Sequence, residues 1–150
     1  MELAPLFNQM PFARLLGIEV VEASEGTATA RLEFSEELLS NPAGEVVHGG
    51  ATYALADTAG DAAVMSLAGV VTPTIDMRMD YLAPATTDLT AAADIVRYGD
   101  SVAVARVEIH DADGTHVATA HGTYKTSGQG EQTPWGEDSE VTERIPDEFQ

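Results

Sequence analysis

The segment His48-Gly49-Gly50 combines residue types that can bind a developing negative charge. A loop ends there and an alanine-rich run begins, so we expect the two glycines to open a helix. The first N–H groups of a helix have no acceptor within it, and the helix dipole adds positive potential. Glycine also lets a ligand approach the backbone closely. This corner is a candidate oxyanion hole, although the glycines could serve only to make a tight turn.

An acid, Asp57, follows on the same expected helix, in a run made otherwise of small and apolar residues. Such an acid destabilises a fold unless it is paired or used. Asp61 lies one turn later on the same face. Repulsion between the two like charges should raise one of their pKa values. Asp57 is therefore a candidate general base or nucleophile, and the alternative is that both acids reach solvent at a helix edge.

The spacing of these groups bears on the number of subunits in the site. Gly49 and Asp57 are eight residues apart, or roughly 12 Å along a helix that rises 1.5 Å per residue. One helix cannot easily direct both groups at a single carbonyl carbon. Two such helices related by a two-fold axis could do so. If the two groups act together, we expect a homodimer with a composite site at its interface.

Hydrophobic periodicity predicts the elements that must position these residues. A short amphipathic helix is expected over 6–16, bent or interrupted at Pro11, and a long buried helix starts at Gly49. Strands are expected over 18–22, 27–34, 74–82, 88–97, 101–110 and 115–126. One-sided strands favour an antiparallel sheet with one buried face, which the long helix can cover. The fold class is α+β.

Length and charge indicate one domain with a tail. Residues 1–126 are expected to form the domain, and 127–150 an acidic tail, flexible or lying on a partner subunit. Seven basic and 25 acidic residues give a formal net charge of -18. Such a chain should repel nucleic acid and anionic membranes. Because the charge is spread along the chain and lysine occurs once, adaptation to a salt-rich cytosol is favoured over a merely solvated surface.

Several classes of chemistry are excluded or unexpected. Cysteine is absent, so there is no disulfide, zinc–thiolate site or cysteine nucleophile. No metal-binding, GxSxG or phosphate-loop motif is found, so neither a metal nor a cofactor is expected. The start of the chain lacks the pattern of a signal peptide, and the long helix carries two acids. We therefore expect a cytoplasmic protein that does not span a membrane.

The combined pattern resembles a known family. The sequence HGG at 48–50, followed by LADTA at 55–59, is similar to the signature of the hotdog-fold acyl-CoA thioesterases, nearest to their phenylacetate-degradation type. The resemblance covers roughly residues 8–126 and includes YLAPA at 81–85. It implies a sheet of about six strands wrapped around one central helix. It also implies an acyl-CoA substrate, no cofactor, and dimers that usually pair into tetramers with active sites between subunits.

The resemblance also implies roles for individual residues. The N–H of Gly49 would bind the thioester carbonyl oxygen, and Asp57 of the facing subunit would activate water or attack the carbonyl. Thr74 would help to orient that water. His48 would support the loop and help to polarise the carbonyl, and Asn41 would position the thioester or the water.

Further residues are candidates for substrate binding. Gly50 and Thr58 belong to the motif itself, and Tyr53 could line an acyl pocket or simply be part of the core. Arg78 and Arg97 are candidates for contacts with the phosphates of coenzyme A, although an arginine on a strand surface is more often a solvated charge. The acyl group itself, aryl or medium-chain, is left open by the sequence.

Two other functions fit the same fold. A non-catalytic acyl-CoA sensor would keep a pocket but would not need an acid on the helix, so Asp57 speaks against it. A hydratase or dehydratase with this fold would need an Asp and a His in a different arrangement. Hydrolysis of an acyl-CoA is the leading prediction.

Overall fold

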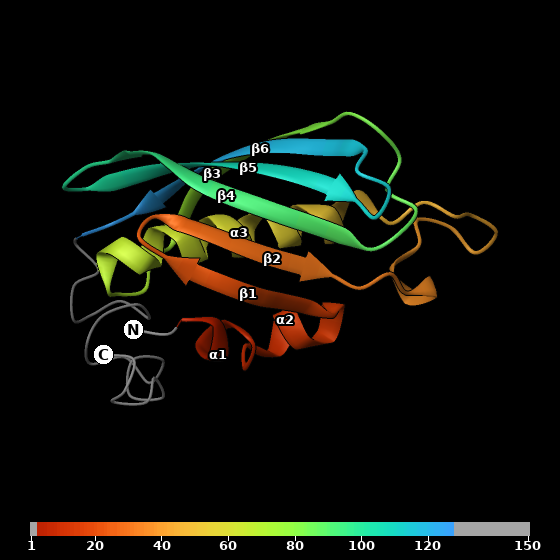
Figure 1. Ribbon diagram of the computed structural model, residues 1–150, viewed down its shortest axis with the longest axis horizontal. Helices are drawn as coiled ribbons and strands as arrows, with labels where there is room; N and C mark the ends of the chain where they lie inside the picture. Colours follow the sequence, from red (N-terminus) through yellow and green to blue (C-terminus); the bar gives the residue numbers. More distant parts are fainter. Residues whose placement is uncertain (1–2, 128–150) are drawn as a thin grey trace.

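Six antiparallel strands form one sheet that wraps around a long helix in the computed structural model, which describes residues 3–127 (Figure 1). The strands follow one another across the sheet in the order β1-β2-β4-β5-β6-β3, so β1 and β3 are its edges. The expected α+β hotdog architecture is confirmed. The strands are β1 (Ile18–Ser24), β2 (Thr27–Leu32), β3 (Thr74–Tyr81), β4 (Leu89–Tyr98), β5 (Val102–Asp111) and β6 (His116–Lys125).

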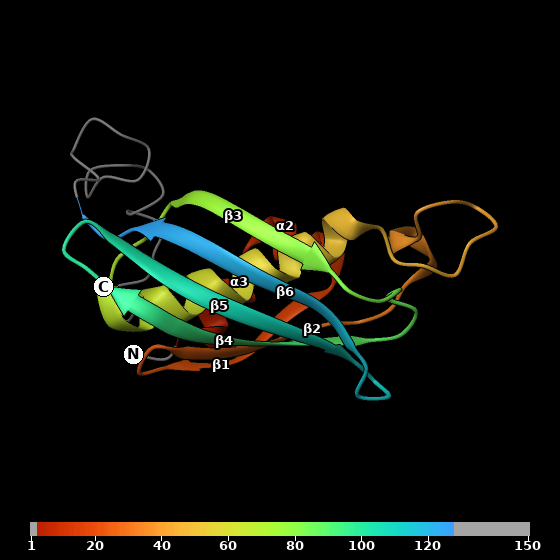
Figure 2. The same ribbon diagram turned by 90° about the horizontal axis from the view of Figure 1, so that it is seen from above.

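The central helix α3 (Gly49–Ala68) is buried on most of its surface. Its side chains are small, and the alanines that face the sheet are fully buried, so the strands can approach the helix closely. The ring of His48 caps the first turn by accepting the N–H of Gly50. The helix ends at Gly69, whose φ of +68° favours a residue without a Cβ. Figure 2 shows α3 as one continuous helix beneath the sheet.

The N-terminal segment differs from the single short helix expected over 6–16. It forms two helices, α1 (Ala4–Phe7) and α2 (Pro11–Leu16), because the chain breaks before Pro11 and the proline starts the second helix. The break is held by Asn8, whose side chain accepts from the N–H of Val20 at 2.8 Å and donates to its carbonyl at 3.0 Å. Asn8, in the interruption between the two helices, therefore fastens this segment to β1.

The six predicted strands are all present, with small differences at their ends. β1 continues two residues beyond the expected end at residue 22, and β2 stops two residues before residue 34. The turn between them is at Glu25 and Gly26, both with positive φ, as in the tight turns that match strand twist. After β2 a short 3₁₀ helix, η1 (Glu36–Leu38), leads into the loop before α3.

All helices and strands of the described part lie between residues 4 and 125. The expected acidic tail falls outside the described residues beyond position 127. Within residues 3–127, no helix is both long and apolar enough to cross a lipid bilayer.

Candidate active site

One face of α3 is fastened to β3 and the residues just before it. Four hydrogen bonds join the two segments, which run in opposite directions, and the helix residues involved are spaced four apart. We call this row of contacts the α3–β3 seam. It consists of Tyr81 hydroxyl to Gly49 carbonyl at 2.7 Å, Tyr53 hydroxyl to Met77 carbonyl at 3.1 Å, Thr74 hydroxyl to Asp57 Oδ1 at 2.8 Å, and Thr72 hydroxyl to Asp61 Oδ1.

Helix and strand geometry explains the two Thr–Asp pairs of the seam. Four helix residues rise about 6 Å, and two strand residues rise about 6.6 Å. Two acids one turn apart on α3 therefore match two threonines separated by one residue in the sequence Thr72-Pro73-Thr74. Each carboxyl group meets its own hydroxyl donor.

The corner at the start of α3 leaves one backbone donor open. The N–H of Gly50 donates to Nδ1 of His48 at 2.8 Å. Within residues 3–127, the N–H of Gly49 has no hydrogen-bond acceptor. Tyr81 holds the corner from β3, and a Cβ added at Gly49 would lie 3.2 Å from its ring. Gly49 can therefore offer an oxyanion its N–H at the positive end of a helix.

The carboxyl group of Asp57 is half-buried. Burial raises the pKa of Asp57 above its ordinary value, and hydrogen bonds from the hydroxyls of Thr74 and Tyr124 oppose that rise. A carboxylate that is partly desolvated and held by hydroxyl donors has the properties of a general base. The structure thus brings Asp57 and Thr74 together, while the orientation of a water by Thr74 stays a prediction.

Asp61 differs from Asp57 in its surroundings. Its partner Thr72 is almost completely buried, and burial raises the pKa of Asp61 to about 7. The nearby charge of Asp57 adds to the rise, while the bond from Thr72 opposes it. The predicted direction of the shift is confirmed, but burial rather than repulsion between the two acids is its larger cause.

A single chain keeps the open N–H and the acid apart. Gly49 and Asp57 lie on the same continuous helix, eight residues from one another, so the separation expected from the sequence holds. Each group borders the α3–β3 seam, one at either end of β3. Within one chain they form two half-sites.

The remaining predicted residues have other partners. Thr58 donates to the carbonyl of Ala54 within α3 at 2.8 Å. Arg78 is 74% exposed and pairs with Asp80 at 3.1 Å, while Arg97 is exposed near the end of β4.

Asn41 accepts from the N–H of Ala43 at 3.1 Å, inside the loop that projects beyond the start of α3 (Figure 2). The structure does not join Asn41, Thr58, Arg78 or Arg97 to the pair of Asp57 and Thr74, and their roles stay predictions. The N–H of Gly50 is occupied by His48, so a contact between Gly50 and substrate also stays a prediction.

Two functional contacts were not foreseen from the sequence. The buried hydroxyl of Tyr124 reaches Asp57 from β6, and Thr72 reaches Asp61. For Thr72 the signal was present, because two threonines flanking one proline match two acids one helical turn apart. For Tyr124 no local signal was present, because Gly60, which leaves room for its hydroxyl on α3, is far from Tyr124 in the chain.

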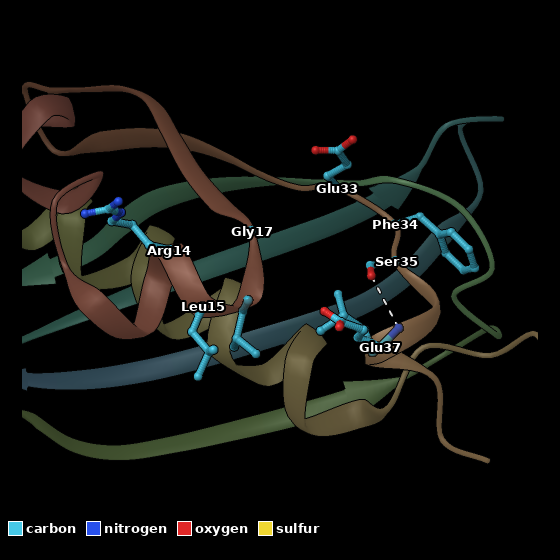
Figure 3. A pocket seen from close by; sticks show the side chains of 9 residues that line it. Arg14, Leu15, Gly17, Glu33, Phe34, Ser35 and Glu37 are labelled. Atoms are coloured by element: carbon cyan, nitrogen blue, oxygen red, sulfur yellow. Dashed lines mark hydrogen bonds between the residues drawn. The ribbon is translucent and has the colours of Figure 1, made fainter. Parts of the chain in front are cut away.

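One open groove lies beside the α3–β3 seam, and another lies beside the N-terminal helix α2. The first, of about 450 Å³, lies beside Gly49 and has a mainly apolar lining of Val46, Val47, Gly49, Thr52, Tyr81, Leu82, Ala83, Pro84, Ala85 and Val117. The second, of about 510 Å³, lies between α2 and residues 33–38 (Figure 3). No predicted site residue lines the second groove. A third hollow, of about 670 Å³, lies in the loop before α3 and is lined by Asn41. The first groove is the one that Gly49 borders.

A sheet wrapped around a helix that carries an open N–H and a held carboxylate defines a hotdog thioester hydrolase. Comparison with known proteins agrees, because residues 44–118, half of the chain, match the model of the thioesterase superfamily. A protein of Halobacterium salinarum that carries an esterase name is 38% identical over 121 residues, which cover 73% of this chain and 80% of that protein. The medium/long-chain acyl-CoA thioesterase YigI of Salmonella typhimurium is 33% identical, covering 77% of this chain and 84% of the relative.

A solved structure gives the same result. The PaaI protein from the phenylacetic acid degradation operon of Escherichia coli superimposes with a TM-score of 0.75 at 27% identity. The match covers 83% of this chain and 89% of that one. The chain belongs to the thioesterase superfamily, and it is a thioester hydrolase.

Proposed function

We propose that this protein hydrolyses acyl-CoA thioesters to a carboxylic acid and free coenzyme A, at a site shared by two subunits. The observation that carries the proposal is the pair of half-sites on α3. An open N–H lies at Gly49, and a carboxylate held by Thr74 lies two turns further on, at Asp57. The first suits a developing oxyanion, and the second suits the activation of water.

The position of β3 supports a shared site. β3 is an edge strand, and within the described residues its outer side pairs with no other strand. If the β3 strands of two copies pair in antiparallel fashion about a two-fold axis, the Tyr81 end of one lies beside the Thr74 end of the other. Gly49 of one subunit then approaches Asp57 of its partner. The pairing of two such dimers into a tetramer stays a prediction.

In the proposed reaction, the thioester carbonyl oxygen accepts the N–H of Gly49. Asp57 either removes a proton from a water that attacks the carbonyl carbon, or attacks that carbon itself. In both cases the thiolate of coenzyme A leaves, and in the second case water then hydrolyses the acyl–Asp57 anhydride to release the acid and free Asp57. Thr74 keeps the carboxylate in place. General-base catalysis typically contributes about 10²–10⁴-fold, and one oxyanion donor contributes about 10²–10³-fold in kcat. Both contributions require that the carboxylate and the N–H group are correctly placed relative to the thioester carbonyl.

The apolar groove beside Gly49 supports the proposal that the acyl group next to the reacting carbonyl is apolar. Its volume of about 450 Å³ and its valine and alanine lining suit hydrocarbon rather than a charged acyl group. The name of the YigI relatives points to medium or long chains, and the operon of PaaI points to an aryl group. We therefore propose an apolar acyl group of either kind.

The proposal is tested by the release of free coenzyme A from acetyl-, medium-chain acyl-, phenylacetyl- and hydroxybenzoyl-CoA in high KCl. Asp57→Asn is measured beside the wild type, and Asp94→Asn on the exposed face of β4 is the matched control. We expect hydrolysis that collapses only in Asp57→Asn. Tight acyl-CoA binding with no hydrolysis in any variant would contradict the proposal and indicate a sensor.

A further inference from the structure

Tyr124 is a buried titratable residue that the proposed reaction does not use. It lies on β6, one strand inward from the edge, and its exposed fraction is 0%. Its hydroxyl donates to the backbone carbonyl of Asp57 at 3.4 Å. A buried phenol needs such a partner because an unpaired hydroxyl in the core is costly.

The chain makes space for this hydroxyl on the helix that faces it and on its own strand. A Cβ added at Gly60, on α3, would lie 2.2 Å from the Tyr124 oxygen. A Cβ added at Gly122, on β6, would lie 2.6 Å from the same oxygen. Only two residues without side chains allow the phenol to reach the helix at this point. The space fits the hydroxyl group itself and not only the ring.

We propose that Tyr124 is a positioning residue that fixes Asp57 for catalysis by anchoring the backbone of α3 at Asp57, next to the carboxylate that Thr74 holds. The inference rests on the proposed role of Asp57 as general base or nucleophile. Thr74 holds the same carboxyl group from β3. Asp57 is therefore held from two neighbouring strands, because Thr74 of β3 donates to its carboxylate and Tyr124 of β6 donates to its backbone carbonyl.

The charges around Asp57 give this arrangement a measurable signature. Asp61 and Tyr53 face it from α3, Asp76 lies nearby on β3, and Tyr124 faces it from β6. None of these groups carries a positive charge. The hydroxyls of Thr74 and Tyr124 are the groups that lower the pKa of Asp57 against its burial. Removal of the Tyr124 hydroxyl should therefore raise that pKa and move the acid limb of the pH–rate profile to higher pH.

The test compares Tyr124→Phe with wild type in steady-state hydrolysis of the best acyl-CoA. Phenylalanine keeps the ring and removes only the hydroxyl. We expect kcat to fall about tenfold, the size of one well-placed hydrogen bond, with KM little changed and the acid limb of kcat/KM at higher pH. Tyr98→Phe is the matched control, because Tyr98 is 43% exposed at the end of β4. Its kcat and pH profile should equal those of the wild type.

A second variant disrupts the same contact by a change in α3 rather than in β6. Gly60→Ala keeps the phenol but puts a methyl group where its oxygen lies, so the hydroxyl must leave Asp57. We expect kcat to fall at least as far as in Tyr124→Phe. Thermal unfolding and an active-site titration of each variant correct kcat for any loss of folded protein.

The outcomes separate this proposal from the one it rests on. If Asp57→Asn keeps full activity, the proposed function fails first. If Asp57→Asn is inactive while Tyr124→Phe retains the wild-type kcat and acid limb, the proposed function stands and the positioning role of Tyr124 is overturned. A Tyr124→Phe variant that is only less stable, with an unchanged pH profile per folded molecule, also overturns it.

Discussion

Asp57 and Asp61 are chemically alike but are placed in different surroundings by their threonine partners. Both acids are half-buried, but Thr74, which holds Asp57, is exposed, whereas Thr72, which holds Asp61, is almost completely buried. Because the pKa of Asp61 is raised to about 7, this group tends to carry a proton below neutral pH. A neutral Asp61 adds no negative charge beside Asp57, which favours the ionised form of Asp57 that the proposed reaction needs.

Thr74→Val should weaken catalysis and shift its pH dependence. The valine keeps the shape but removes the donor to Asp57, so the pKa of Asp57 rises and less carboxylate is present at low pH. We expect kcat at neutral pH to fall about tenfold and the acid limb to move to higher pH. Thr74→Ser keeps a hydroxyl and should stay near wild type. Equal profiles for the valine and serine variants would refute the role of this hydrogen bond.

Asp61→Asn should change how stability depends on pH. Burial raises the pKa of Asp61 from 3.8 to about 7, so between these values the folded protein holds a proton that the unfolded chain has released. This contribution is fully present below pH 4 and is lost as the pH rises through 7. At pH 8 the asparagine variant should be more stable than wild type, by up to about 4 kcal/mol.

Denaturant unfolding at constant KCl measures this difference at pH 4.5 and pH 8. The advantage of Asp61→Asn should shrink towards the lower pH, because the wild-type carboxyl group is then protonated in the folded protein. A difference that is the same at both pH values would show that Asp61 is not a buried, proton-holding group.

At the scale of elements, the N-terminus of α3 permits a direct test of the backbone donor. Gly49 is the first helical residue, where proline is tolerated, and His48 has the extended ψ of 133° that a following proline requires. Gly49→Pro removes the N–H, whereas Gly49→Ala keeps it. Both add a Cβ that meets the ring of Tyr81 at the same distance. The alanine variant therefore controls for that contact.

We expect Gly49→Pro to lower kcat about 10²–10³-fold relative to Gly49→Ala, the usual effect of losing one oxyanion donor. Steady-state kinetics with the best acyl-CoA measures the ratio, and circular dichroism checks that α3 is intact. If the two variants were equally active, the N–H of Gly49 would not be the donor.

Sequence patterns predicted the elements better than the contacts between them. Alternating apolar residues marked all six strands, and a run of small residues marked α3, because these periods follow from local geometry. On the edge strand β3, however, Ile75 is 57% exposed, although its alternation with Asp76 predicts the apolar face. A register shift lies between Thr74 and Asp76, where Ile75 sits. The interruption at Pro11 was foreseen, but the long-range bonds that join Asn8 to β1 beside it were not.

For the candidate site too, local motifs could be predicted from the sequence and long-range contacts could not. The motif around HGG and Asp57 could be found in the sequence, and the resemblance pointed to Thr74, but as a residue that orients water and not as a donor to Asp57. The contact of Tyr124 with Asp57 could not, because it depends on Gly60 and Gly122 meeting across two elements that are distant in the chain. Local patterns carry no information on such meetings.

At the scale of the whole molecule, the net charge of -18 opposes the binding of a polyanionic substrate. Coenzyme A should be repelled at low salt, and at 1 M salt the Debye length is only about 3 Å, so the repulsion is largely screened. We expect KM to fall as KCl rises from 0.1 to 2 M. Initial rates measured over this range provide the test. A KM that is constant or rises would contradict the adaptation to high salt that we infer from composition.

The central claim is that each active site takes Gly49 from one subunit and Asp57 from its partner. It is tested most directly by co-expressing Gly49→Pro with Asp57→Asn in equal amounts. Each variant alone should be almost inactive. In mixed dimers one site combines the intact Gly49 of one chain with the intact Asp57 of the other, so random pairing should restore about one quarter of wild-type activity. No recovery in dimers shown to be mixed would contradict the shared site.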